Sequence, residues 1–415
     1  MGDASDSATD EDISTFTYEE GSSKKETFSA KLKYLLRYEC ADNFSPVYYV
    51  SIMGTGASSN ILYNFPYPAH WLQVCGWIMF SIAVLLFIST SFMTLAGFYY
   101  HPKRIVSYHT DPNDAVYMGC YVMGYITIIN FVHLVLGTRH IAFVWALWWI
   151  AIFMAVYTAS IIVFLSIFSK LNKNYDPQEV TAIFLLPIVT LTVASSNGHL
   201  LTPTLPTLQQ QIITELVSLM IWMISIALAF IVITIYFARL IIYKIPTTDM
   251  IFSSWLPVGF LGQSSYSILL FGVNMFKLIP DPYLGHSFLV TSALVALFLM
   301  SFGYFMVFIA VSSLLSKTKP FAKNPNTAYT TTFGTIRWSK YWWAVTFPCG
   351  TMSLSNLEIS KGFVGNYELP FFRVMSCIFA LGMLTITVTC LVGIVIYIVK
   401  RVARLFDKLD HKSIV

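Results

Sequence analysis

The sequence predicts an all-α membrane protein that crosses the bilayer ten times, as five helical hairpins around a central pore. The 415 residues are 56% hydrophobic and only 11% charged, with a mean hydropathy of +0.66. Apolar stretches of about 20 residues, long enough to span a bilayer as helices, recur along the chain. They are continuous rather than alternating, which excludes the strands of a membrane barrel. Every second stretch also carries a group of small polar residues.

Ten membrane segments follow from the hydropathy. Their predicted bounds are 46–65, 71–98, 113–137, 141–168, 180–198, 209–238, 249–274, 284–315, 341–357 and 366–399. The even-numbered segments are mostly longer and more apolar, whereas the odd-numbered ones carry Gly, Ser, Thr, Asn and Pro. A ten-helix domain is therefore expected over residues 45–400.

The two ends of the chain differ from this apolar domain. Residues 1–24 are rich in Asp, Glu, Ser and Thr and predict a disordered acidic tail. Within residues 25–44, apolar side chains recur at helical spacing among lysines, which predicts an amphipathic helix lying on the membrane surface. Residues 401–415 are expected to form a basic tail. Both tails are predicted to be cytoplasmic.

The basic residues fix the predicted orientation. If the amino terminus lies in the cytoplasm, every Lys and Arg except Arg139, Lys277, Lys361 and Arg373 falls on the cytoplasmic side. Cytoplasmic loops of membrane proteins are enriched in Lys and Arg. We therefore predict that both termini are cytoplasmic and that all odd segments run from the inside to the outside.

A polar motif recurs in the odd segments. The first segment contains GTGASSN at 54–60, which is similar to GTMSLSN at 350–356 in the ninth. The fifth segment ends in VASSN, the third reads MGYITIIN, and the seventh carries GFLGQSSYS. No comparable set occurs on the even segments.

We predict that these polar residues line a pore. The predicted lining residues are Gly54, Thr55, Ser58, Ser59, Asn60, Asn130, Ser195, Ser196, Asn197, Gln263, Ser264, Ser265, Thr351, Ser353, Ser355 and Asn356. Small residues also allow membrane helices to pack closely, and Asn can bond helices together, so packing is the alternative for each residue. Recurrence on the odd segments alone favours the pore.

Three prolines fall inside odd segments and predict kinks, namely Pro187, Pro257 and Pro348. Proline cannot donate to the carbonyl four residues earlier, so a free carbonyl is expected at Ile183, Ser253 and Ala344. Such backbone is tolerated at membrane depth only where protein covers it or a wet cavity meets it.

Apart from Asp114 and Asp249 at the cytoplasmic ends of two of them, the odd segments carry no fixed charge, which excludes a cation filter built from carboxylate rings. Hydroxyl and amide donors suit a small anion that is held weakly, although the same lining would also pass a small neutral solute. His133 and His199, at the outer ends of two odd segments, are candidates for titrating residues. Glu215 and Arg373 lie near the outer ends of the sixth and tenth segments, where they could form an ion pair with each other or snorkel to the interface, in a structural role.

Other function classes find no support in the residues. Walker, dinucleotide and zinc-ligand patterns are absent, so we predict no cofactor and no metal. The odd segments contain no set of nucleophile, base and metal ligand, which argues against an intramembrane enzyme. Ten segments with a fivefold repeat do not fit a seven-helix receptor.

Four stretches resemble one known family, the tellurite-resistance/dicarboxylate transporters. They are GTGASSNILYNFPYPAHWL (54–72), LLPIVTLTVASSNG (185–198), LPVGFLGQSSYSILL (256–270) and WWAVTFPCGTMSLSN (342–356). The resemblance runs from about residue 40 to 400 and is strongest to the family's fungal sulfite efflux pumps. The family also includes plant slow anion channels and a yeast malate permease.

The resemblance implies ten helices around a central pore, a homo-oligomer that is trimeric in relatives, and export of sulfite or bisulfite across the plasma membrane. It also implies that Phe347, directly before Pro348, closes the pore as a gate. A dicarboxylate permease and a slow anion channel are the alternatives within the family. The sequence departs from the malate branch around the first segment, which argues against a dicarboxylate.

Overall fold

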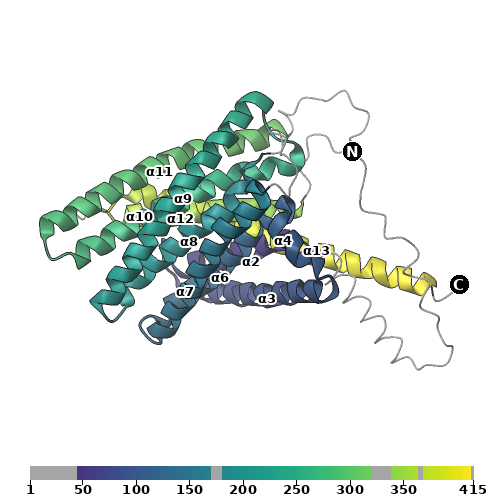
Figure 1. The fold of residues 1–415 in the computed structure, drawn as a ribbon, viewed down its shortest axis with the longest axis horizontal. Helices are drawn as coiled ribbons and strands as arrows, with labels where there is room; N and C mark the ends of the chain where they lie inside the picture. Colours follow the sequence, from purple (N-terminus) through teal and green to yellow (C-terminus); the bar gives the residue numbers. More distant parts are fainter. Residues whose placement is uncertain (1–43, 170–179, 319–337, 363–367, 413–415) are drawn as a thin grey trace.

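The structure, a computed structural model, describes residues 44–169, 180–318, 338–362 and 368–412. In these ranges the regular elements are all helices (Figure 1). The acidic tail predicted at 1–24 lies outside the described residues, as does all but Phe44 of the surface helix predicted at 25–44. Both remain predictions.

Five buried helices correspond to the odd segments, and we call them the inner helices. They are α2 (Tyr49–Tyr63), α6 (Met118–Leu136), α8 (Leu186–Leu201), α10 (Leu256–Leu278) and α12 (Thr346–Ser360). Their contacts close a ring, because α2 packs against α6, α6 against α8, α8 against α10, α10 against α12, and α12 against α2. The recurring polar motifs thus belong to helices that surround one axis.

Five longer helices correspond to the even segments, and we call them the outer helices. They are α3 (His70–Tyr100), α7 (Ile141–Tyr157), α9 (Leu208–Tyr243), α11 (Pro282–Ser316) and α13 (Pro370–Lys412). Each packs against the inner helix that precedes it in the chain. The most apolar stretch of α9 is only 33% buried, against 83% for that of α8, which is what a lipid-facing layer around a protected ring requires.

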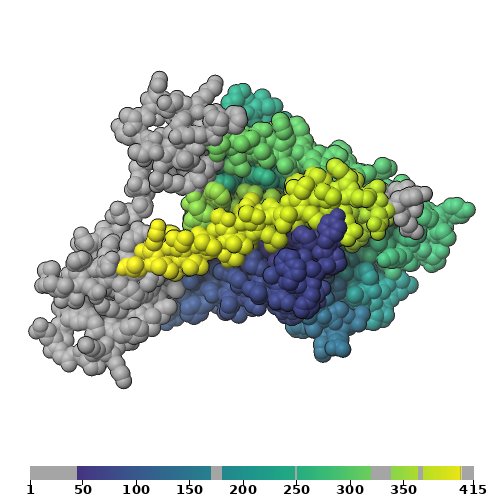
Figure 2. Space-filling view, turned by 180° about the vertical axis from the view of Figure 1, so that it is seen from behind, coloured from purple at the N-terminus to yellow at the C-terminus, as the bar shows by residue number. Residues whose placement is uncertain are grey.

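The remaining elements connect these two layers. Two π-helical segments, Thr158–Ile162 and Phe164–Phe168, extend α7, and the short helices α4 (Lys103–Thr110) and α5 (Pro112–Ala115) lead from α3 to α6. A 3-10 turn, Thr202–Thr204, follows α8. On the face shown in Figure 2, α13 lies beside α3, where Leu384 and Leu391 pack with Leu72 and Met79. This contact joins the last outer helix to the first.

Within the described residues, eight helices are long and apolar enough to cross a membrane. They comprise the five outer helices together with α6, α8, α10 and the turns that precede them. The inner helices α2 and α12 are not among the eight, since each has 15 residues and carries the polar motif. The structure therefore supports a polytopic helical protein, and the number of ten spans remains a prediction.

The three prolines lie where a 3-10 helix passes into an α-helix, rather than inside a kinked α-helix. The 3-10 helices are Ala182–Leu185, Thr248–Trp255 and Lys340–Val345, and a fourth, Pro46–Tyr48, precedes α2. Proline fits the first turn of an α-helix because its missing N–H has no intrahelical partner there. The kinks that we predicted inside α-helices at Pro187, Pro257 and Pro348 are thus corrected to junctions.

The free carbonyls that we predicted are corrected in the same way. The carbonyl of Ile183 accepts from the N–H of Leu186, and that of Ser253 accepts from the N–H of Leu256. Each bond spans three residues, as in a 3-10 helix, and replaces the bond that the proline cannot make. The backbone is therefore satisfied at these two junctions without help from a ligand.

The carboxyl-terminal helix is longer than the sequence predicts. Helix α13 continues to Lys412 and projects from the bundle in Figure 1. No break separates the ten-helix domain from the basic tail that we predicted to begin at residue 401.

Glycines let the inner helices approach at backbone distance. A Cβ placed on Gly262 of α10 would lie 2.9 Å from the backbone nitrogen of Met352 and 3.0 Å from the carbonyl carbon of Thr351, both on α12. Backbone atoms cannot turn aside as a flexible side chain can. The α10–α12 contact therefore requires glycine at this position.

We expect Gly262→Ala to lower the thermal stability of the purified protein, because α10 and α12 must move apart to admit the methyl group. Gly382→Ala in α13 is the matched control, since nothing lies within 4 Å of a Cβ there. Alanine favours a helix over glycine by about 1 kcal/mol, so the control should be unchanged or slightly stabilised. Equal melting temperatures for the two variants would contradict the close contact.

Candidate functional site

A narrow cavity of about 30 Å³ opens at the amino-terminal ends of the inner helices. All five inner helices or the turns before them contribute to its lining, through Val50 and Met53, Tyr117, Leu186, Leu256 and Ala344. A cavity that touches every member of a ring lies on the axis of that ring. It therefore marks one end of the path that the sequence predicts, the cytoplasmic end in the predicted orientation.

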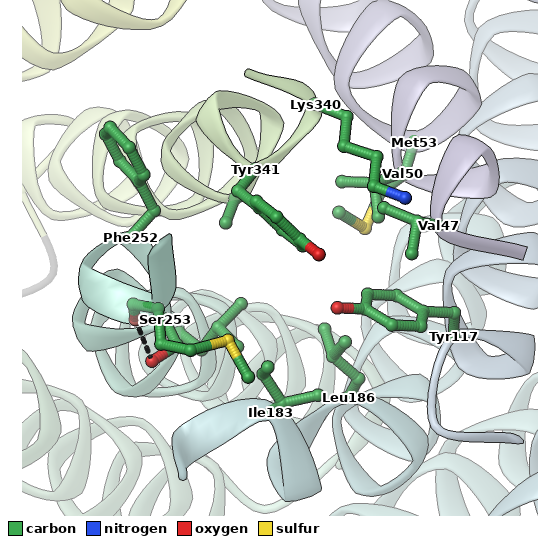
Figure 3. A pocket seen from close by; sticks show the side chains of 13 residues that line it. Val47, Val50, Met53, Tyr117, Ile183, Leu186, Phe252, Ser253, Lys340 and Tyr341 are labelled. Carbon is green, nitrogen blue, oxygen red and sulfur yellow. Dashed lines mark hydrogen bonds between the residues drawn. The ribbon is translucent and has the colours of Figure 1, made fainter. Parts of the chain in front are cut away.

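Three polar groups enter this mostly apolar cavity. Figure 3 shows the amine of Lys340 and the phenol oxygens of Tyr117 and Tyr341 directed into the space between the helices. Lys340 lies just before the predicted membrane segment 341–357, and burial lowers the pKa of its amine, an effect that Asp114 opposes. The cavity thus combines one cation with two hydroxyl groups, a set that suits a small oxyanion.

Phe347 lies one helical turn beyond Ala344, further along the axis. Its side chain is 6% exposed and packs against Gly259 of α10, where an added Cβ would lie 3.3 Å from Cδ1 of Phe347. Gly259 in turn lies one turn beyond Leu256 of the cavity wall. Phe347 thus packs between α12 and α10 in the buried core, one turn beyond the cavity wall, and its role as a gate remains a prediction.

Several of the predicted lining residues bond one inner helix to the next. Nδ2 of Asn60 on α2 donates to the carbonyl of Thr127 on α6 at 2.9 Å, and Asn197 on α8 bonds with Asn130 on α6. Gln263 on α10 donates to Ser196 on α8. Ser355 on α12 donates to Ser265 on α10 at 2.7 Å, and Ser195 on α8 lies 2.9 Å from Ser267 on α10. We call Asn60, Asn130, Asn197, Ser196 and Gln263 the amide belt.

Other members of the predicted set turn to the outer helices instead. The hydroxyl of Ser58 lies 3.0 Å from that of Thr387 on α13, and Ser353 donates to the carbonyl of Ser376 on the same helix at 2.9 Å. Asn356 accepts a hydrogen bond from Tyr304 on α11 at 2.6 Å. Ser265 also donates outward, to the carbonyl of Ala296 at 2.9 Å. These side chains bond the two layers of helices together.

The last members of the set have local partners. The hydroxyls of Thr55, Ser59 and Thr351 donate to carbonyls of their own helices, at 2.7, 2.7 and 3.0 Å. Gly54 packs against Trp343 and Thr346 ahead of and within α12. The hydroxyl of Ser264 is buried without a partner.

Two polar atoms of the amide belt have no hydrogen-bond partner, and they decide which of its side chains could donate a hydrogen bond to an anion. Oδ1 of Asn60 and Oδ1 of Asn197 are buried without a partner. The amide of Asn60 cannot be reversed, because its nitrogen donates to two carbonyls, those of Gly56 and Thr127. The Asn130–Asn197 pair can be, since turning both amides exchanges donor and acceptor and leaves a free N–H on Asn197. Asn197 is thus the better donor to an anion.

The two histidines lie near the far end of the ring. Nε2 of His133 is 3.0 Å from the hydroxyl of Thr204, and its Nδ1 is buried without a partner. Nδ1 of His199 lies 2.6 Å from Oε2 of Glu215, so this imidazole faces α9. Glu215 does not pair with Arg373, whose guanidinium donates to the carbonyl of Pro66 and covers the ring of Tyr67. The predicted Glu215–Arg373 pair is therefore wrong.

Sequence reasoning missed the lysine and tyrosines of the cavity, and also Asn274, which donates to Glu215 at 2.7 Å. Of these residues, Asn274 could have been found from a pattern in the sequence. Gln263, Ser267 and Asn274 are spaced by four and seven residues and so share a face of α10, the face that meets α8.

Fold and site together define the class of protein: a helical membrane protein in which five inner helices form a ring with a cavity at one end. Comparison with known proteins gives the family. The model of the voltage-dependent anion channel family matches residues 43–395, and the chain belongs to that family.

Curated proteins that are similar to this chain include three from fungi. The sulfite efflux pump SSU1 of Candida albicans is 53% identical over 360 residues, covering 86% of this chain and 75% of that protein. The sulfite efflux pump SSU1 of Saccharomyces cerevisiae is 30% identical over 383 residues, covering 81% and 83%. That of Arthroderma benhamiae is 28% identical over 358 residues, covering 84% and 88%.

The amide belt and the outward-facing residues should respond differently to the same substitution. Asn197→Asp introduces a negative charge between two inner helices, and we expect it to lower anion flux at least tenfold. Asn356→Asp faces Tyr304 on an outer helix, where a carboxylate still accepts the phenol's hydrogen bond but loses the bond that Nδ2 of Asn356 donates to the carbonyl of Met352 at 2.8 Å. Surface expression should therefore fall, while flux per surface molecule should remain close to wild type. The measurement is flux normalised to surface protein. Equal losses in both variants would contradict a distinct role for the belt.

Proposed function

We propose that this protein is a plasma-membrane anion transporter that exports sulfite or bisulfite along the axis of the inner ring. The observation that carries the proposal is the cavity to which all five inner helices contribute, with Phe347 directly beyond it. Membership of an anion channel family supports an anionic substrate. The sulfite efflux pumps that match at 53% and 30% identity over most of the chain favour sulfite.

The proposal includes ten spans in five inner–outer hairpins, with both termini in the cytoplasm. Helices α2 and α12 occupy the ring beside α6, α8 and α10, and outer helices screen them from lipid. A screened helix needs less hydrophobicity to lie at membrane depth, which is why their polar motifs are tolerated. The uneven distribution of Lys and Arg supports the orientation. The homo-trimer implied by the family resemblance remains a prediction.

In this proposal each region of the path has a separate physical task. Lys340 raises the local concentration of anions at the cytoplasmic mouth. Phe347 closes the path by occupying volume. Beyond it the amide belt offers neutral donors and acceptors, which replace part of the anion's hydration without binding it tightly. On the far side of Phe347, the described residues of the inner helices include no Lys or Arg before the last turn of each helix. The anion therefore meets no fixed positive charge there that would bind it tightly.

A slow anion channel is the second candidate function, favoured by the description of the family itself. The two functions share a substrate class and differ in whether flux follows the electrochemical gradient alone. A dicarboxylate permease is a further outcome that the following experiment separates.

Purified protein in liposomes loaded with sulfite should release it when the interior is made negative, because the anion then moves down the electrical gradient. Protein-free liposomes correct for leakage of the neutral acid. Deleting the gene in its host should cause sulfite sensitivity. Transport of malate together with absent sulfite efflux and normal sulfite tolerance would overturn the proposal.

Removing the ring of Phe347 should open the path. An aromatic plug blocks through its volume, so Phe347→Ala should produce a leak current or a several-fold higher flux, with reduced selectivity among anions. Folding should survive, because the ring borders the axial space rather than the centre of a packed layer.

Phe260→Ala is the matched control for this prediction. Phe260 lies on α10 one residue beyond Gly259 and is fully buried in the core. The same truncation there should cost about 3–5 kcal/mol of stability and produce no leak. Current and surface expression are measured together for both variants. A well-expressed Phe347→Ala protein with unchanged flux would exclude the gate.

A further inference from the structure

A buried chain of five polar side chains lies between α8, α9 and α10, near the predicted outer end of the ring. Nδ1 of His199 is 2.6 Å from Oε2 of Glu215, and Asn274 donates to Oε1 of that carboxylate at 2.7 Å. On the other side of the imidazole, Nε2 is 3.2 Å from the hydroxyl of Ser195, which is 2.9 Å from that of Ser267. All five residues are at most 4% exposed.

This row of hydrogen-bonded side chains contains one carboxylic acid, Glu215, which has no Lys or Arg partner among the described residues. Among the described residues, the only ion-pair partner of Glu215 is His199. An isolated carboxylate in an apolar interior is strongly unfavourable, so the two groups must share a proton, either as imidazolium and carboxylate or as imidazole and carboxylic acid. The net charge of the pair depends on how many protons it holds.

Other ionisable side chains on the neighbouring elements have different surroundings. His133 on α6 bonds with Thr204. Lys277 on α10 is exposed one turn beyond Asn274, Arg139 and His140 before α7 are exposed, and His286 at the start of α11 is exposed and lies against the ring of Phe276. Within the part of the chain that the structure describes, the only charged or titratable group in contact with the carboxylate is therefore the imidazole of His199.

The hydrogen-bonded side chains around His199 and Glu215 are also close to the proposed anion path. Ser195 and His199 lie on α8 beside Ser196 and Asn197, two members of the amide belt, and Ser267 lies one turn beyond Gln263 on α10. In a medium of low dielectric constant, adding a proton to the pair makes the wall of the ring more positive and favours an anion within it. Losing a proton has the opposite effect.

We propose that His199 and Glu215 form a proton-binding site inside the membrane domain, and that anion flux through the inner ring rises when this site is protonated. The second clause rests on the proposed function, whereas the first does not. The ligand is a proton alone, and it enters and leaves by simple protonation without any other reactant. Ser195, Ser267 and Asn274 position the two groups, and none of them needs to titrate.

Glu215→Gln separates this role from a purely structural one. The glutamine keeps both hydrogen bonds, since its oxygen accepts from Asn274 and its nitrogen donates to the imidazole. It removes only the charge and the exchangeable proton. Glu368→Gln, at an exposed carboxylate, is the matched control.

The proton is measured first, without any anion. Infrared difference spectra of the purified protein in lipid, taken between acid and alkaline buffers, should contain a carboxyl band of a buried glutamic acid. The band should be absent from Glu215→Gln and present in Glu368→Gln. Identical spectra for wild type and Glu215→Gln would overturn the proton site.

Flux is measured second, as sulfite release from liposomes at fixed voltage and internal pH while the external pH varies. Dividing the wild-type flux by the Glu215→Gln flux cancels the protonation of sulfite itself, because both proteins meet the same substrate. The ratio should rise as the external pH falls, by up to about tenfold per pH unit, the limit for one proton. A constant ratio would overturn the dependence of flux on the site.

Two further controls keep the outcome interpretable. If Glu215→Gln does not yield folded protein, His199→Gln replaces it in the flux measurement, because glutamine can bond with the carboxylate but cannot hold the proton. In the infrared measurement the Glu215 band should then shift rather than vanish, because its hydrogen-bond partner has changed, and an unchanged band would overturn the proton site. If the wild type releases no anion at any voltage, the proposed function fails and the flux dependence fails with it. The infrared result then still decides whether the proton site exists.

Discussion

Polar groups at membrane depth must find hydrogen-bond partners within the protein, and the architecture of this chain depends on that constraint. The inner helices carry the hydroxyls and amides, and nearly all of these groups bond to a neighbouring inner helix, an outer helix or their own backbone. The outer helices cover the ring and present apolar side chains such as Leu95 and Phe153 to the lipid. The helices therefore form two layers, because a single layer could not present apolar side chains to lipid and at the same time pair its polar groups within the protein.

The same constraint explains how the inner helices begin. A proline near the entrance of a buried helix would leave a carbonyl unpaired, at a cost of about 1–3 kcal/mol. A preceding 3-10 turn supplies the missing bond from a residue three positions on, as for Ile183 and Ser253. Both of these residues, and Ala344, also line the cavity at the amino-terminal ends of the inner helices. At Ile183 and Ser253 the chain therefore enters this cavity wall without leaving a carbonyl unsatisfied.

Much of this fold could be predicted from the sequence, because its signals are periodic and long. Hydropathy indicated ten segments. In the described structure the outer helices and three inner ones are long and apolar enough to cross a membrane, whereas α2 and α12 stand out by their repeated motif rather than by their hydrophobicity. The direction of each side chain could not be predicted in this way. Successive residues of a helix differ by about 100°, so a seven-residue motif turns almost twice around the axis. GTGASSN accordingly sends Ser58 to α13 and Asn60 to α6.

The partner of Glu215 was missed for a related reason. Opposite charge and similar depth suggested Arg373, but depth along the membrane normal does not determine which helices are neighbours. Glu215 lies seven residues into α9, about 10 Å from its start, opposite the last turns of α8. Helix α9 follows α8 after a short turn and runs antiparallel to it. This connection is a better guide to the partner of Glu215 than charge alone, and it indicates His199 on α8.

The placement of charge along the ring has a consequence for transport. Two unit charges 4 Å apart at an effective dielectric constant of 20 attract by about 4 kcal/mol, which corresponds to roughly a thousandfold slower release. A neutral hydrogen bond contributes only about 0.5–1.5 kcal/mol. Lys340 lies at one mouth, and the His199–Glu215 pair lies to the side of the path near the other. In the proposed function, Lys340 attracts the anion at one end, the His199–Glu215 pair attracts it at the other only when that pair has gained a proton, and neutral amides lie between them, so that the anion can both enter and leave.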